Sequence, residues 1–212
     1  MEQHHSMKEE LLCHFPYAMF SVALSMIVLS LLTMNNNVKV LHQLFHNFHF
    51  LHLLFAGSGT VLIFRKYSQN VLLGGLVGFF VPVVFCTLSD AILPYYGGRF
   101  LGLNMHLHWC FWEHLDKVLP FLLVGIINGF VAATHHVSKQ IFYSAWSHFA
   151  HIFVSSMASM LYLVSFGFSD WHSQIGLVFL FLLFAVLVPC TLSDVVVPMT
   201  VAKAKHAHSK AS

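Results

Sequence analysis

Six long apolar segments constrain this chain more than any other feature of its sequence. The 212 residues are 58% hydrophobic and only 8% charged, so a water-soluble fold would lack the polar surface needed to cover its core. About 20 apolar residues suffice for a helix to cross a bilayer. Such segments are expected at 16–34, 43–64, 71–93, 118–134, 141–166 and 174–198. A β-barrel needs alternating polar and apolar residues, and 175–188 does not alternate. The sequence therefore predicts an all-α integral membrane protein with six transmembrane helices.

A five-residue motif, Cys-Thr-Leu-Ser-Asp, occurs twice, at 86–90 and at 190–194. Proline follows each aspartate by four residues, at Pro94 and Pro198. Two copies 104 residues apart indicate an internal duplication. The expected organisation is a first three-helix repeat at 1–100, an outer interfacial segment at 101–117, a second three-helix repeat at 118–202 and a cytoplasmic tail at 203–212. Because each repeat has an odd number of spans, the two repeats would have inverted topology, as in many secondary transporters.

Basic residues between the expected spans predict the orientation. If both termini lie on one side, that side carries seven basic residues and the other carries three: Lys8, Arg65, Lys66, Lys139, Lys203, Lys205 and Lys210 against Lys39, Arg99 and Lys117. Segments rich in Lys and Arg stay on the cytoplasmic side of a membrane. We therefore expect a multi-pass protein with both termini cytoplasmic, in a plasma or inner membrane, with the lipid bilayer as a partner and no nucleic acid partner. The sequence does not indicate an oligomeric state.

Histidine is unusually frequent, with 17 residues in the chain. Four of them recur at helical spacing and so share one face of the second expected helix: His42, His46, His49 and His52. Two further histidines, His148 and His151, are their counterparts in the fifth. One interpretation is that such imidazoles only form hydrogen bonds between helices. Four on a single face favour a functional role instead.

Each copy of the motif adds a thiol and a carboxylate on one helical face, because Cys and Asp stand four residues apart. We expect each repeat to bring two imidazoles, one thiol and one carboxylate together, at opposite depths of the membrane. The two expected ligand sets are His46, His49, Cys86 and Asp90, and His148, His151, Cys190 and Asp194. Imidazole and thiolate are typical ligands of zinc or a neighbouring transition metal. The metal would be the transported substrate, and no cofactor is required.

A weaker set of residues is expected along the substrate pathway. It consists of His42, His52, Ser89, Ser193, His106, Cys110, Glu113 and His114. The last four would share one face if 104–117 formed an amphipathic helix on the membrane surface. Such a helix would serve either as an anchor in the interface or as an ion-collecting site.

These patterns favour a membrane transporter or permease, most readily for a divalent transition-metal cation. A proton-coupled carrier or a channel for another small solute remains an alternative, since Ser, Thr, Asp and freed carbonyls also suit sodium or a proton. The rival from another class is a membrane enzyme, because His42-x3-His46-x2-His49 is similar to the histidine boxes of di-iron hydroxylases and desaturases. Those boxes contain more histidines, clustered at one membrane face. We therefore expect no enzymatic activity.

Overall fold

The computed structural model describes residues 7–35, 37–134 and 140–211, with side chains at 15–34, 37–134 and 149–204. Within these ranges every regular element is helical, and there is no strand. The all-α prediction is confirmed. The main helices are α1 (Met7–Asn35), α2 (Val38–Tyr67), α3 (Val71–Thr87), α4 (Leu93–Phe100), α5 (Cys110–Glu113), α6 (Leu115–Thr134), α7 (Gln140–Ser165), α8 (Ile175–Thr191) and α9 (Val197–Ala211).

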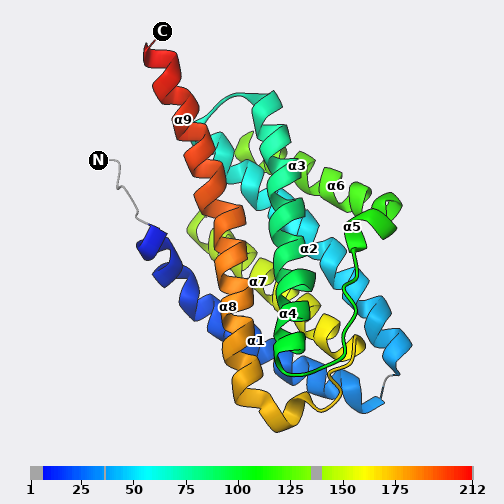
Figure 1. Ribbon diagram of the computed structural model, residues 1–212. Helices are drawn as coiled ribbons and strands as arrows, with labels where there is room; N and C mark the ends of the chain where they lie inside the picture. The colour runs from blue at the N-terminus through cyan, green and yellow to red at the C-terminus, as the bar shows by residue number, and fades with distance from the viewer. Residues whose placement is uncertain (1–6, 36, 135–139, 212) are drawn as a thin grey trace.

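Two pairs of these helices are continuous rods. A π-helical turn at Leu88–Ile92 joins α3 to α4, and another at Leu192–Val196 joins α8 to α9. The two rods lie side by side and run in opposite directions (Figure 1). Each copy of the motif therefore lies at a π-helical turn, and the two turns belong to rods that run antiparallel to each other.

In the described part of the chain, five helical segments are long and apolar enough to cross a membrane. They are Phe15–Met34, Val38–Tyr67, Val71–Phe100, Leu115–Thr134 and Trp171–Ala204. The described part of α7, Phe149–Ser165, is also apolar but shorter. Large apolar side chains such as Phe80 and Phe184 are exposed on the rods. These features are compatible with a multi-pass membrane protein, in which lipid covers the outward-facing side chains.

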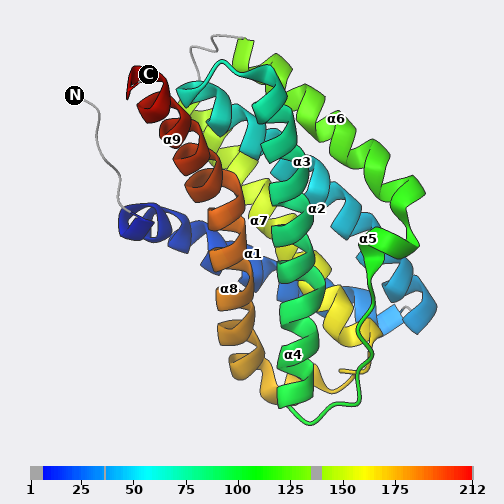
Figure 2. The same cartoon turned by 45° about the horizontal axis from the view of Figure 1, so that its top comes forward.

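Helices α2 and α7 lie at the centre of the bundle. Helix α2 packs against α3, α6 and α7, and α7 packs in turn against α1 and α8. Figure 2 shows α6 lying along α2. Glycine permits this approach, since a side chain at Gly129 would come within 2.7 Å of the Ser58 carbonyl oxygen. Both histidine-bearing helices are therefore held inside the bundle.

The expectation of an amphipathic helix over 104–117 is wrong. Residues 104–109 are not helical, Cys110–Glu113 forms the short helix α5, and a separate helix, α6, begins at Leu115. The preceding segment runs irregularly from the end of α4 to α5 (Figures 1 and 2). Tertiary contacts hold it, because the Tyr162 hydroxyl donates to the His106 carbonyl and accepts from the His108 N–H, both at 3.2 Å. These bonds take the place of the helical hydrogen bonds that the spacing of residues suggested.

Candidate metal centre

The π-helical turns have a local cause in the prolines that follow them. A proline lacks the N–H for its own helical bond, and its ring clashes with the carbonyl four residues earlier. For Pro94 and Pro198 that carbonyl belongs to Asp90 and Asp194. The helix widens there, and each hydrogen bond reaches five residues back. The Leu93 N–H donates to the Leu88 carbonyl, and the Val197 N–H donates to the Leu192 carbonyl. π-Helical turns of this kind are frequent at functional sites.

Each widened turn is held by a hydroxyl from the opposite half of the chain. The Ser159 hydroxyl of α7 donates to the Ser89 carbonyl at 3.0 Å. The Thr60 hydroxyl of α2 donates to the Ser193 carbonyl, also at 3.0 Å. The two motif copies are thus stabilised in the same way, each by the central helix of the other half.

Asp90 is a fully buried carboxylate with four hydrogen-bond donors around it. Its Oδ2 lies 2.9 Å from His49 Nδ1 and 2.7 Å from His52 Nδ1. Its Oδ1 accepts from the hydroxyls of Ser89 at 2.7 Å and Ser155 at 3.1 Å. Burying a charge is costly unless it is paired and hydrogen-bonded, and this carboxylate satisfies both conditions.

Asp194 occupies the matching position in the second motif but has fewer partners. Its Oδ2 lies 2.6 Å from His151 Nδ1. Within the described part of the chain, its Oδ1 and the neighbouring Ser193 hydroxyl are buried without a hydrogen-bond partner. Gly59 leaves space for this carboxylate, since a side chain there would meet Asp194 at 3.2 Å. Each half therefore supplies a carboxylate-histidine pair, and among the described residues the second pair has fewer hydrogen-bond partners than the first.

Three potential ligands from both halves meet at one point inside the bundle: His52, His151 and Cys190. We call them the central cluster. All three are buried, and their ligand atoms lie within 4.8 Å of one another. His52 Nε2 is 2.7 Å from His151 Nε2 and 3.6 Å from Cys190 Sγ.

The two carboxylates determine which imidazole nitrogens face the centre of this cluster. An ionised carboxylate only accepts hydrogen bonds, so the Nδ1 atoms of His52 and His151 carry hydrogen. A neutral imidazole then has its lone pair on Nε2. Because the two Nε2 atoms face each other at 2.7 Å, a proton between them satisfies both. A metal cation, with bonds of about 2.0 Å to each nitrogen, would take its place once the two rings move slightly apart. Carboxylate-bound histidines of this kind are common around protein-bound metals.

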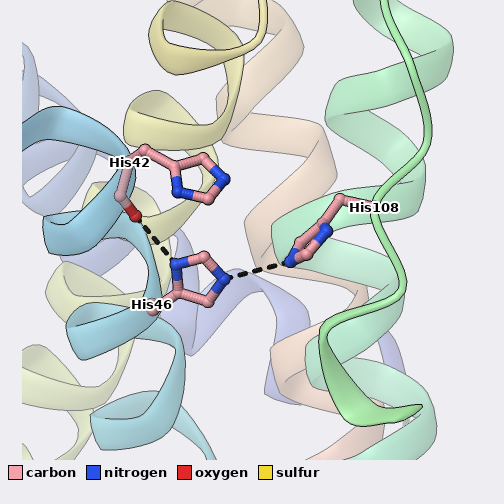
Figure 3. A group of neighbouring side chains, drawn as sticks. All are labelled: His42, His46 and His108. Carbon is pink, nitrogen blue, oxygen red and sulfur yellow. Dashed lines mark hydrogen bonds between the residues drawn. The ribbon is translucent and has the colours of Figure 1, made fainter. Parts of the chain in front are cut away.

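A second group of side chains lies where α2 begins, beside the segment that leads to α5. His42, His46 and His108 have ligand atoms within 4.8 Å of one another, and so do His108, Glu113 and His114. We call these five residues the loop cluster. Figure 3 shows its first three members, with His46 Nε2 3.0 Å from His108 Nε2. His108 Nδ1 in turn lies 3.0 Å from Glu113 Oε2.

Burial shifts the pKa of two groups in this segment, outside the membrane-spanning helices. Desolvation lowers the pKa of His108 below its usual value and outweighs the opposing effect of Glu113. A neutral imidazole is the form that binds metal. Burial likewise raises the pKa of the Cys110 thiol to about 12. Cys110 therefore stays protonated and belongs to neither cluster.

The structure redistributes the residues that the sequence analysis grouped. His49 Nδ1 contacts Asp90, so these two expected ligands do lie together, but His46 joins the loop cluster. His52 takes the position beside His151 and Cys190. The central cluster thus combines His151 and Cys190 of the second expected set with His52, which the sequence analysis placed only along the substrate pathway. The side chain of His148 lies outside the described residues.

The weaker pathway residues also separate. His42, Glu113 and His114 belong to the loop cluster, whereas His106 is exposed and joins neither cluster. Sequence reasoning missed His108 and the role of Ser155 as a donor to Asp90. The closeness of His108 to Glu113 and His114 was a usable signal. No local pattern could indicate the role of Ser155, because Asp90 is 65 residues away from it in the sequence.

Comparisons of the chain with protein-family models, curated proteins and solved structures gave no match. The function proposed for this protein therefore rests on the geometry of its side chains.

Proposed function

We propose that the protein is a multi-pass membrane transporter for a divalent transition-metal cation, zinc or a close neighbour. The central cluster is its cargo site. The observation that carries this proposal is the convergence of His52, His151 and Cys190, from both halves of the chain, at one buried point. A transported ion has to be held by groups that can move apart, and ligands divided between two halves meet that requirement.

The chemistry of the ligands favours a transition metal. Two imidazole nitrogens and one thiolate sulfur suit zinc and its neighbours, whereas magnesium and calcium prefer oxygen ligands. Asp90 and Asp194 hold the imidazoles in the orientation that points Nε2 inward. A metal ion bound there would displace the proton shared by the two Nε2 atoms and the proton of the Cys190 thiol, so binding would release protons.

The inverted three-helix repeat explains how this site would open to either side. In this proposal α1–α4 and α6–α9 are repeats of opposite orientation, with both termini in the cytoplasm. Three features support it: the matching π-helical turns, the antiparallel rods, and the reciprocal bonds of Ser159 and Thr60 to the other half. Transporters with such repeats place the substrate at the repeat interface and expose it by rocking one repeat against the other.

Metal uptake by proteoliposomes tests the proposal. We expect zinc influx with the wild-type protein and at least a tenfold lower rate with Cys190→Ala. His106→Ala is the matched control, because it removes a residue from outside both clusters and should keep the wild-type rate. Equal influx in wild type and Cys190→Ala, or no influx above protein-free vesicles with any of zinc, cobalt, manganese and cadmium, would contradict it.

A proton-coupled carrier for another solute is the second candidate, and one observation favours it. His49, Asp90, His52, His151 and Asp194 form a continuous chain of hydrogen bonds with links of 2.6 to 2.9 Å. Such a chain can pass a proton from one half to the other. A pH-driven solute flux that continues in a metal chelator, with no zinc binding by the purified protein, would favour this candidate over the metal transporter.

A further inference from the structure

We propose that the loop cluster is a second transition-metal site, which receives the ion from water and loads the central cluster. Its loading role rests on the proposed transport function. Its ability to bind metal does not, because the donors of the two clusters are different residues. The occupant we infer is zinc or a neighbouring divalent ion bound mainly by imidazole, without a thiolate.

Hydrogen bonds prepare two imidazoles of the loop cluster for a metal. His46 Nδ1 lies 2.9 Å from the His42 carbonyl, which can only accept, so Nδ1 carries the hydrogen and Nε2 keeps its lone pair. Glu113 acts in the same way on His108 Nδ1 at 3.0 Å. Both Nε2 atoms then face each other at 3.0 Å, the arrangement already seen between His52 and His151.

The site has further ligands within reach. The His42 and His114 rings each lie 4.6 Å, centre to centre, from the His46 ring. His42, His46 and His108 therefore form one group of ligand atoms, His114 lies beside it, and Glu113 supports His108 from its Nδ1 side. Zinc in proteins takes four such ligands, or three and a water when the site has to exchange.

Exposure distinguishes the loop cluster from the central one. His42, His108 and His114 are half-buried and the Glu113 side chain is 52% exposed, whereas the three residues of the central cluster are buried. An ion from solution can therefore reach the loop cluster directly. It can reach the central cluster only by passing other side chains.

The loop that carries His108 is held firmly enough to form a site. Tyr162 of α7 binds the backbone at both His106 and His108. The Phe166 ring stacks on His108, with ring centres 5.6 Å apart and planes at 27°. His108 is thus positioned by the end of α7, and a change in the tilt of α7 would move it relative to α2.

The histidine stripe of α2 connects the two sites. His46 and His52 are six residues apart, which corresponds to about 9 Å along a helix. His49 lies between them, fully buried, with Nδ1 on Asp90. Its Nε2 has no hydrogen-bond partner among the described residues. This nitrogen therefore offers a lone pair for an ion in transit between the clusters.

Cobalt(II) titration of the purified full-length protein separates the two sites by their spectra. Cobalt bound to a thiolate gives a ligand-to-metal charge-transfer band, which cobalt bound only to nitrogen and oxygen lacks. We expect two equivalents of cobalt in the wild type, of which one produces the charge-transfer band. His108→Ala, and independently the milder His42→Gln, should lose the equivalent without that band. His106→Ala should retain both.

Transport kinetics test the loading role on the same variants. With zinc as substrate, His108→Ala should raise KM at least fivefold and change kcat less than twofold, because the central cluster is intact. If His108→Ala and His42→Gln both retain two equivalents of cobalt, the loop site is refuted while the central one stands. If the wild type shows one equivalent without a charge-transfer band, and His108→Ala removes it, the proposed cargo site fails and the loop site stands. An unchanged KM in variants that have lost the equivalent would refute loading.

Discussion

Replacement of Asp90 by asparagine tests whether the buried carboxylates prepare the central cluster for metal. The choice of substitution follows from the four donors around Asp90: His49, His52, Ser89 and Ser155. An alanine would leave all four unpaired, at about 1 to 3 kcal/mol each. The total of about 4 to 12 kcal/mol is comparable to the whole stability of a protein. Asparagine keeps the shape and removes only the charge.

The expected loss concerns metal affinity. An amide oxygen can still accept from His52 Nδ1, and rotating serine hydroxyls can accept from the amide nitrogen, so the imidazole keeps its orientation. However, the His52 imidazole no longer has the negative charge of Asp90 beside it, and that charge makes Nε2 a stronger metal ligand. Changes to such supporting carboxylates weaken metal binding by about 10- to 100-fold, which is about 1.4 to 2.7 kcal/mol. Asp194→Asn acts through one imidazole in the same way, so a loss of similar size is expected.

Calorimetric titration of zinc into the detergent-solubilised protein measures this loss. Asp116→Asn is the matched control, since it makes the same chemical change at an exposed position outside both clusters. The control should bind zinc as the wild type does. If Asp90→Asn and Asp194→Asn both retain wild-type affinity within a factor of two, the carboxylates do not support the ligands and the reasoning fails.

Three further experiments test other features of the structure. Gly125→Ala should lower stability by about 1 to 3 kcal/mol, because a methyl group there would overlap the Leu54 backbone, whereas Gly75→Ala meets nothing within 4 Å; thermal unfolding in detergent compares them. Cys110 should resist maleimide up to about pH 10, since its pKa is raised to about 12 and the thiolate is the reactive form; mass spectrometry of native protein that found Cys110 labelled at pH 8 would contradict this. Cys190→Ser should weaken cadmium binding more than zinc binding, because cadmium is softer; equal losses in competition titrations would argue against a sulfur ligand.

The sequence predicted the helical architecture well because bilayer-spanning helices are encoded by local composition. Uninterrupted apolar runs placed the helices, and the prolines at 94 and 198 accompany the π-helical turns that precede them. The segment 104–117 was the exception. Its spacing suits a helix, but the hydroxyl of Tyr162, more than 50 residues away, binds its backbone in another form.

The sequence by itself determined that the chain is all-α and apolar, that its Cys-Thr-Leu-Ser-Asp motif is duplicated, and that α2 carries a histidine stripe on one face. These are properties of neighbouring residues and of helical periodicity. Only the tertiary structure decided which histidine meets which partner. A helical face spans enough width that His46, His49 and His52 point to different neighbours, and the packing of α7 and the rods selects His52 for His151 and Cys190. The division into a central and a loop cluster depends on contacts between residues up to 138 positions apart, which no local pattern encodes.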